Sequence, residues 1–314
     1  MGGVSSSEKD RLSMKFKISV PATSANVGPG FDVMGLAFDM YNRFTFDTNC
    51  HERLQIEGCL PEFATPENNL LYSTLTQVLA QHGRLAPNLR ITFDTDLPVC
   101  SGLGSSSTCI VAGVMAANVL GNLAMDTEQI LRTATLIEGH PDNVAPAILG
   151  GFVAAIVEDG LVYWHRYPIS DRISFYAMMP DVRVPTEMAR AALPKTYSLT
   201  DCIYNLSRVP ILVEGLERAD PRLIRAGCKD RIHQEYRLQL IPQGAEVMRF
   251  AVEQTDAVAV YISGAGPTIV AVVIDDDDAF GKQMGQFVAG LDLEWHVRKM
   301  HVHRQGAKLA VLDA

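Results

Sequence analysis

The sequence predicts an α+β protein with two domains. Strand-like and helix-like segments mix without the strict strand–helix–strand alternation that a doubly wound parallel sheet requires. The chain has 314 residues, of which 47% are apolar, which is enough to bury a large core. A chain of this length usually divides into more than one domain. Three loops that carry glycine, at residues 21–32, 98–108 and 263–267, interrupt this pattern.

Short alternating segments predict strands in the first half of the chain. They cover Lys15–Val20, Arg43–Asp47, Leu54–Glu57 and Leu89–Phe93. Pro21–Asp32 is predicted to be an irregular loop, because glycine, proline and small polar residues fill it. Ala145–Val157 is predicted to run through two glycines into a further strand.

Apolar residues at helical spacing predict three helices in the same half. The first covers Asn69–His82, and the second covers Cys109–Leu120 with apolar pairs such as Ile110/Val111. The third covers Thr127–Ile137, begins at Asp126 or Thr127 as its cap, and ends near Gly139.

The second half begins after about Trp164 and is predicted to carry both kinds of element. Strands are expected over Ser174–Met179, Val258–Ile262 and Ile269–Ile274, with a strand-like tail over Leu293–His303. Helices are expected over Thr186–Leu193, Thr200–Glu217, Arg222–Cys228 and Ala279–Ala289. The apolar stretch Ala257–Ile274 is too broken by Ser263–Pro267 to be a membrane span.

The segment from Pro98 to Thr108 is predicted to bind phosphate. Gly102 and Gly104 allow a tight turn and a close approach to an anion, and three serines lead from them into an apolar helix. Such a loop directs free N–H groups and the positive end of the helix dipole at its guest. A plain turn before a buried helix is the alternative interpretation.

Two common nucleotide-binding motifs are excluded for this segment. It lacks the Gly-Lys-Ser/Thr of the P-loop and the Gly-x-Gly-x-x-Gly of the dinucleotide fold. Cys100 is interpreted as lining the loop, with a reactive thiol as the alternative.

Charge and composition exclude several classes of partner. A formal net charge of −9 argues against nucleic acid and anionic membranes. Asp275–Asp278 is interpreted as a solvated turn, with a metal site as the weaker alternative. The six cysteines form no Cys-x-x-Cys pair and are typical of a reducing compartment. Residues 1–13 contain no apolar signal core and are interpreted as a leader or vector remnant before Met14, so a cytoplasmic protein is expected.

At this point the sequence resembles the GHMP kinases, a family of galactokinases, homoserine kinases, mevalonate kinases and phosphomevalonate kinases. Pro98–Ser107 is similar to the ATP loop of that family, and Ser263–Pro267 to its C-terminal glycine loop. Further strings bring the resemblance closest to the homoserine kinases, and together they span Lys15 to about Val273: Pro21–Asp32, Glu138–Pro146, Pro185–Arg190 and His233–Arg237. The resemblance implies an N-terminal α/β ATP-binding domain over 14–165 and a ferredoxin-like domain over 166–314. It also implies ATP-dependent phosphorylation of the L-homoserine hydroxyl in threonine biosynthesis, and a homodimer.

The resemblance further implies roles for individual residues. ATP would lie on Pro98, Val99, Cys100, Ser101, Gly102, Leu103, Gly104, Ser105, Ser106, Ser107 and Thr108, and Mg²⁺ on Ser106 and Glu138. L-Homoserine would be held by Asn26, Asp32, His140, Asn143, Arg190, Arg237 and Gly264, with Asn143 and Thr186 near the phosphoryl path. Arginine suits the carboxylate because its planar fork binds it bidentately. His140 is a general base or a substrate contact, and the role of Asp142 stays open.

The expected mechanism is direct in-line transfer without a dedicated base, because no Asp–Lys pair is evident near the phosphate loop. Two alternatives remain at this stage. One is another GHMP small-molecule kinase, and the other is a binding module that senses ATP or a metabolite without turnover. The Arg190/Arg237 pair favours an amino-acid carboxylate over a neutral sugar.

Overall fold

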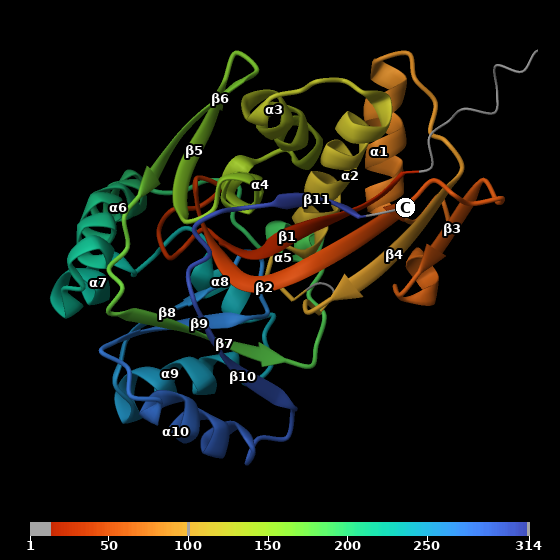
Figure 1. The fold of residues 1–314 in the computed structure, drawn as a ribbon. Helices are drawn as coiled ribbons and strands as arrows, with labels where there is room; N and C mark the ends of the chain where they lie inside the picture. The colour runs from red at the N-terminus through yellow and green to blue at the C-terminus, as the bar shows by residue number, and fades with distance from the viewer. Residues whose placement is uncertain (1–13, 99–100, 313–314) are drawn as a thin grey trace, which may run out of the picture.

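The computed structural model describes residues 14–98 and 101–312. Two sheets, one above the other in Figure 1, form the middle of the molecule. The first is seven-stranded, with the order β11-β1-β2-β4-β3 and the hairpin β5–β6 attached to β2. Its strands are β1 (Lys15–Ala25), β2 (Met34–Asp47), β3 (Leu54–Glu57), β4 (Leu89–Thr95), β5 (Phe152–Glu158), β6 (Leu161–Tyr167) and β11 (Lys308–Leu312).

Four helices cover the upper face of the first sheet in Figure 1: α1 (Leu70–Gln81), α2 (Ser105–Gly121), α3 (Thr127–Glu138) and α4 (Pro141–Leu149). Phe16, Ile18 and Val20 of β1 alternate toward these helices and pack against Leu71 and Val111. This alternation makes one face of the strand apolar, as expected for a half-covered sheet. A short 3-10 turn, η2 (Pro61–Phe63), precedes α1.

The second sheet is antiparallel and has the order β10-β7-β9-β8. Its strands are β7 (Ile173–Pro180), β8 (Ala257–Ile262), β9 (Ile269–Ile274) and β10 (Trp295–Met300). In chain order this is a 4-1-3-2 arrangement, the β-α-β-β-α-β pattern of ferredoxin-like domains. Its helices and connections are α5 (Thr186–Ala191), α6 (Leu199–Arg218), α7 (Pro221–Gly227), α8 (Gln234–Leu238), α9 (Gly244–Gln254) and α10 (Ala279–Val288). The predicted α+β class is confirmed.

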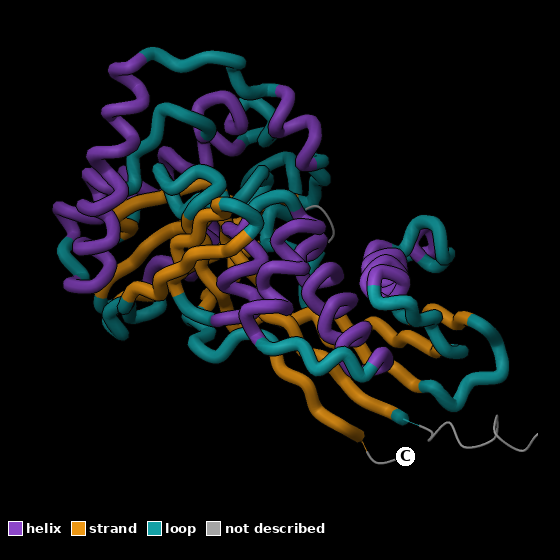
Figure 2. The backbone as a smooth tube through the Cα atoms, turned by 90° about the horizontal axis from the view of Figure 1, so that it is seen from above, coloured by secondary structure: helices purple, strands orange, loops and turns teal. Residues whose placement is uncertain are grey.

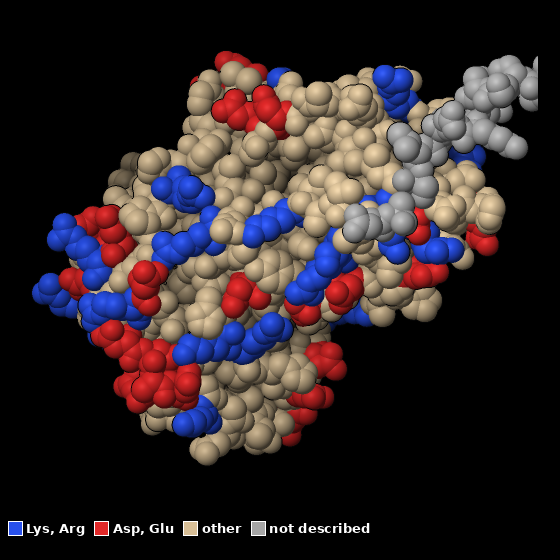
Figure 3. All heavy atoms as spheres, viewed as in Figure 1, with Lys and Arg blue, Asp and Glu red and all other residues tan. Residues whose placement is uncertain are grey.

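The two sheets are joined by one continuous core. Phe38 and Phe152 of the first sheet pack with Phe175 of the second and with Leu212 of α6. The view from above in Figure 2 shows the strands crossing beneath the helices of the first half. Lys and Arg side chains are interspersed with Asp and Glu over the face drawn in Figure 3. Among the described residues, none of the helices has the length and apolarity that crossing a membrane demands.

The predicted loop over Pro21–Asp32 is wrong in its first part, because β1 continues to Ala25. Pro21 lies at a register shift between β1 and β2, where a missing N–H is tolerated. The strand expected within Ala145–Val157 begins only at Phe152, because α4 occupies Pro141–Leu149. Pro141 at the first helical position is compatible with that helix.

Five helices and strands were not predicted: α4, β6, α8, α9 and β11. The 3-10 turn η2 was not predicted either. Strand β11 pairs with β1, from Lys15↔Leu312 to Ser19↔Lys308, so the end of the chain returns to the first sheet. The predicted boundary after residue 165 falls within β6, and the chain passes to the second sheet between Tyr167 and Ile173. The two-domain division by residue number stays a prediction, with β11 belonging to the first sheet.

Candidate active site

The phosphate loop leads directly into helix α2, as the glycine and serine pattern predicts. Gly102 and Gly104 have positive φ values of 80° and 72°. A Cβ at Gly102 would lie 2.5 Å from the Ser263 carbonyl oxygen, so a larger residue cannot sit there without a shift. Helix α2 starts at Ser105, and the N–H groups of its first turn have no partner within the helix. They form an anion-binding terminus.

All three glycine-bearing loops meet at this terminus. The Ser263 hydroxyl donates to the Gly102 carbonyl at 2.6 Å, and the Thr268 N–H donates to the Ser101 carbonyl at 3.2 Å. The Gly264 N–H donates to the Ala25 carbonyl at 3.1 Å. Segments 26–33, 101–104 and 263–268, which are far apart in the sequence, therefore form one rim.

Glu138, the last residue of α3, faces the start of α2. Its Oε1 accepts a 2.6 Å hydrogen bond from the Ser107 hydroxyl. Burial raises the pKa of Glu138 above its ordinary value, and the Ser107 hydrogen bond opposes that shift. The contact is with Ser107, which is buried, whereas Ser106 is exposed. A carboxylate and a hydroxyl at an anion-binding terminus are the hard oxygen donors that Mg²⁺ prefers, so these residues fit the metal.

Asn143, in the first turn of α4, is tied to the phosphate loop by Thr23. The Thr23 hydroxyl donates to Asn143 Oδ1 at 2.7 Å, and the Thr23 N–H donates to the Leu103 carbonyl at 3.1 Å. Since Oδ1 is the acceptor, the Asn143 amide N–H groups remain for another partner. A Cβ at Gly104 would lie 2.0 Å from the Thr23 hydroxyl oxygen.

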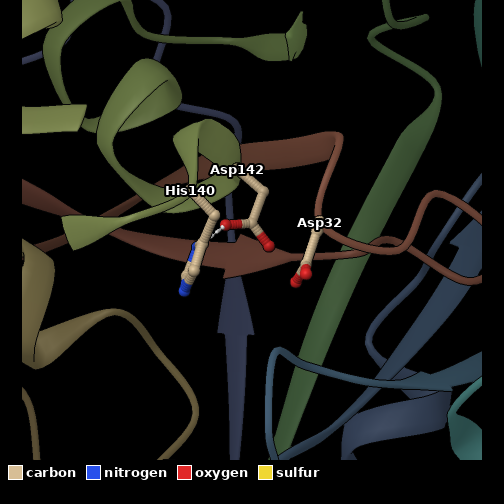
Figure 4. Close-up of side chains that lie close together, drawn as sticks. All are labelled: Asp32, His140 and Asp142. Atoms are coloured by element: carbon tan, nitrogen blue, oxygen red, sulfur yellow. Dashed lines mark hydrogen bonds and ion pairs between the residues drawn. The ribbon is translucent and has the colours of Figure 1, made fainter. Parts of the chain in front are cut away.

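Two carboxylates and a histidine lie together at the junction of α3 and α4 (Figure 4). One ligand-type atom from each of Asp32, His140 and Asp142 lies within 4.8 Å of the others. His140 Nδ1 is 2.5 Å from Asp142 Oδ1, and Asp142 is only 2% exposed. This hydrogen bond raises the pKa of His140. Asp142 therefore holds the His140 ring in place. This contact accounts for the position of the Asp142 carboxylate and assigns that carboxylate no chemical step.

Asp32 is paired with Arg190 of α5. Arg190 Nη1 and Nη2 donate to the two Asp32 oxygens at 3.0 and 3.1 Å. The Asp32 N–H in turn donates to Asn26 Oδ1 at 3.0 Å, and Asn26 Nδ2 donates to the Gly264 carbonyl at 2.9 Å. Asn26 and Asp32 both have positive φ, at 70° and 56°, so the turn brings the carboxylate toward the second half of the chain.

Arg237 of α8 lies near the Phe31 ring, as Arg190 does. It is 2% exposed, and its Nη1 donates to the Gly264 carbonyl at 2.7 Å. Within the described part of the chain it has no carboxylate at ion-pair distance, and its Nε has no hydrogen-bond partner. Burial lowers the pKa of Arg237, with Asp32 opposing that shift. A buried guanidinium without a counter-charge is costly, so this position is built to receive an anion.

The structure brings most of the predicted site residues together on the rim. Asn26, Asp32, Arg190, Arg237 and Gly264 are linked directly by the contacts above. Thr186 is exposed at the start of α5, one helical turn before Arg190. Pro98 is exposed, and the predicted ATP contacts Val99 and Cys100 lie outside the described residues.

Sequence reasoning missed the residues that support the rim. They are Thr23 behind Asn143, Ser263 on the phosphate loop, and Phe31 and His233 beside Arg237. Ser107 was predicted as an ATP contact, but its hydrogen bond to Glu138 was not. Only His233 carried a local signal, since it stands four residues before Arg237 and shares a helix face with it.

This fold and site define a kinase of the GHMP class. The model for the GHMP kinases N terminal domain matches residues 69–151, and the model for the GHMP kinases C terminal matches residues 212–281. The chain belongs to the GHMP kinase family, whose members use ATP.

Homoserine kinases are among its relatives in the family. The chain is 39% identical over 290 residues to homoserine kinase of Clostridium botulinum, covering 92% of this chain and 97% of that protein. It is 40% identical over 293 residues to homoserine kinase of Clostridium beijerinckii, covering 93% and 97%.

Solved structures agree. Homoserine kinase from Cytophaga hutchinsonii superposes with a TM-score of 0.82 at 30% identity, covering 98% of this chain and 100% of that one. Mevalonate diphosphate decarboxylase from Staphylococcus aureus shares the fold at 13% identity, with a TM-score of 0.70 over 95% and 98% of the two chains.

Proposed function

We propose that this chain transfers the γ-phosphoryl group of ATP to the side-chain hydroxyl of L-homoserine, giving O-phospho-L-homoserine for threonine biosynthesis. The observation that carries the proposal is Arg237, a buried guanidinium without a carboxylate partner among the described residues, on the rim of the phosphate loop. An amino-acid carboxylate supplies the missing charge. The relatives named homoserine kinases support the same substrate.

The acceptor side of the proposal assigns a partner to each end of homoserine. Arg237 and Arg190 bind the carboxylate, and Asp32 with Asn26 binds the ammonium. Gly264 contributes through its carbonyl oxygen, which accepts hydrogen bonds from both Arg237 and Asn26 and so fixes their relative positions. His140 and Asn143 lie at the hydroxyl end, and Thr186 contacts the phosphoryl path.

The donor side of the proposal uses the phosphate loop from Pro98 to Thr108. The N–H groups at the start of α2 bind the phosphates, and the helix dipole favours their charge. Glu138 and Ser106 are the proposed ligands of Mg²⁺, and Ser107 joins them because its hydroxyl lies against Glu138. When bound, Mg²⁺ offsets the negative charge on the phosphate oxygens.

The chemical step is proposed to be in-line transfer without a strong protein base. Asp142, a buried carboxylate beside the proposed hydroxyl end, is already bonded to His140. The homoserine proton then leaves late, to phosphate or solvent, and the protein contributes positioning and charge. Asp142→Asn tests this: a near-total loss of kcat with homoserine affinity unchanged would overturn it. Asn143→Ala in the same assay measures the positioning contribution.

A coupled ADP-release assay with Mg-ATP tests the function itself. L-Homoserine should be turned over, and mevalonate and galactose should not. ADP release with mevalonate or galactose alone would favour another GHMP kinase, and ATP binding without ADP release would favour a sensing module. A homodimer and a cytoplasmic location are further parts of the proposal. Light scattering on the purified protein and fractionation of cells test them.

A further inference from the structure

Phe31 stands at the centre of the cationic part of the site. Its ring centroid is 5.1 Å from the Arg237 guanidinium carbon and 5.7 Å from that of Arg190. The His233 ring lies 5.4 Å from it, tilted by 32°. Cations within about 6 Å of an aromatic ring are attracted by its negative face. One side chain therefore contacts both arginines that the proposed function assigns to the substrate carboxylate.

The two arginines differ in how their positive charges are balanced. Arg190 has a full counter-charge in Asp32, which binds it through both oxygens. Arg237 has no carboxylate at ion-pair distance among the described residues, and Asp32 acts on it only from further away. Burial lowers the pKa of Arg237, and the positive charge of Arg190 adds to that shift. A carboxylate of the protein would neutralise the Arg237 charge, but it would also occupy the guanidinium N–H groups that a ligand carboxylate needs. An aromatic ring attracts the cation and leaves its charge free for the ligand.

His233 supports Arg237 in the same neutral way. It is fully buried, and its Nε2 lies 2.8 Å from the Gly28 carbonyl oxygen. A carbonyl only accepts, so Nε2 carries the proton and Nδ1 presents its lone pair, 3.5 Å from Arg237 Nη1.

Three charged groups lie around the His233 ring, and burial outweighs the nearest of them. They are Asp230, 3.8 Å from Nε2, together with Arg237 and Asp32. The Asp230 oxygens accept from backbone N–H groups of residues 232–234 and from the Asn205 amide, so its charge is already stabilised. Burial outweighs Asp230 and lowers the pKa of His233.

Resting on the proposed function, we propose that Phe31 and His233 are positioning residues that hold Arg237 and Arg190 side by side and leave Arg237 without a counter-charge until a carboxylate binds. Neither residue touches the reacting atoms. Phe31 holds both guanidiniums, and His233 ties Arg237 to the turn that carries Phe31 and Asp32.

The test compares L-homoserine with L-homoserinol, in which CH₂OH replaces the carboxylate. In the wild type, Phe31→Leu, Phe31→Tyr and His233→Gln, the KM of each substrate and of ATP is measured by ADP release. Phe93→Leu is the matched control, because Phe93 is a half-buried ring in edge contact with Phe44, away from the rim. Melting temperatures report on folding, and the KM for ATP reports on the intact donor side.

Phe31→Leu is expected to raise the KM for homoserine about tenfold, the equivalent of about 1.4 kcal/mol. The KM for homoserinol and for ATP should stay within about twofold, because neither ligand presents a carboxylate to the arginines. Phe31→Tyr keeps the ring and should restore the wild-type KM within about threefold, while His233→Gln should raise the homoserine KM with kcat little changed.

Three results would overturn the proposal: an unchanged homoserine KM in Phe31→Leu, equal losses for homoserine and homoserinol, or the same loss in Phe93→Leu. The wild-type protein separates this proposal from the function on which it rests. If the wild type releases no ADP with homoserine, the proposed function fails and the positioning role falls with it. If the wild type is active and the variants behave alike, only the positioning role fails.

Discussion

Arg190 and Asp32 form a bidentate ion pair across the two halves of the chain, with N–O distances of 3.0 and 3.1 Å. Asp32 belongs to the turn after β1, and Arg190 to helix α5, 158 residues later. In the proposed function these are the groups for the ammonium and the carboxylate of the substrate. A zwitterion that inserts between them replaces one ion pair by two, so its two charges offset the cost of separating the pair.

The first prediction concerns that insertion. Asp32→Asn removes the acceptor for the ammonium and frees Arg190, so the KM for homoserine should rise at least about tenfold, because hydrogen bonds to charged groups contribute about 1.5–3 kcal/mol. The KM for ATP should change less than about twofold, since no hydrogen bond or ion pair joins Asp32 to the described residues of the phosphate loop. Steady-state ADP release measures both constants.

Asp275→Asn is the matched control for Asp32→Asn. Asp275 also forms a bidentate pair with an arginine, Arg172, on an exposed part of the second sheet. Its loss should leave both KM values unchanged. A homoserine KM that stays at the wild-type value in Asp32→Asn would contradict the assignment of the ammonium site.

The second prediction separates stability from function at Arg237. A buried guanidinium without a carboxylate partner contributes little to stability, so Arg237→Met should leave the melting temperature within about 3 °C of the wild type or raise it. The same change should raise the KM for homoserine more than about tenfold. Thermal unfolding and ADP release on one preparation measure the two effects. A large drop in melting temperature with homoserine KM preserved would show that Arg237 is structural.

Local elements were predictable where the sequence carries its own boundaries. Strands β3 and β9 begin and end at the predicted residues. Gly58 ends the alternating segment Leu54–Glu57, and the apolar run Ile269–Ile274 lies between Pro267 and Asp275. Helix α3 begins one residue after Asp126, whose side chain and that of Gln129 form a capping box. Elements were not predicted where local signals conflict. Pro146 within α4 indicates a helix break, although the helix continues through it.

The site was predictable as a set of motifs and not as a set of contacts. The resemblance implied Glu138, Asp32, Arg190 and Arg237 as site residues, and these stay predictions. The support behind them depends on segments that meet only in the fold: Thr23 and Asn143 are 120 residues apart, and Ser263 and Gly102 are 161 apart. A single sequence does not show which residues so far apart along the chain will come into contact. It also offers no reason to prefer Ser107 over Ser106, because adjacent helical residues differ only in the direction they face.

The third prediction uses the close approach at Gly104. Its φ is 72°, and a Cβ would lie 2.0 Å from the Thr23 hydroxyl oxygen and 3.1 Å from Asn143 Oδ1. Gly104→Ala should therefore break the Thr23–Asn143 hydrogen bond and lower kcat at least about tenfold, with a loss of stability of roughly 1–3 kcal/mol from overpacking. Turnover and thermal unfolding measure these effects.

Gly285→Ala is the matched control, because a Cβ at Gly285 of α10 meets nothing within 4 Å. A helical alanine there should stabilise the protein by about 0.5–1 kcal/mol and leave kcat unchanged. Equal kcat in Gly104→Ala and Gly285→Ala would mean that the Thr23–Asn143 link has no part in catalysis.

The fourth prediction is a pH dependence with a definite sign. The hydrogen bond to Asp142 raises the pKa of His140 above its ordinary 6.5. The folded protein then holds a proton on His140 that the unfolded chain releases, so the stabilisation is complete below pH 6.5 and is lost as the pH rises through the folded-state pKa. Asp142→Asn removes the cause of the shift.

The measurement is the difference in melting temperature between the wild type and Asp142→Asn from about pH 6 to pH 9, and it should shrink as the pH rises. His233 titrates in the opposite direction, because burial lowers its pKa, but both proteins contain it and its contribution cancels in the difference. His140→Gln, which has no titrating ring, should lack this slope as well. A difference that stays constant or grows with pH would contradict the assignment of the proton to the His140–Asp142 pair.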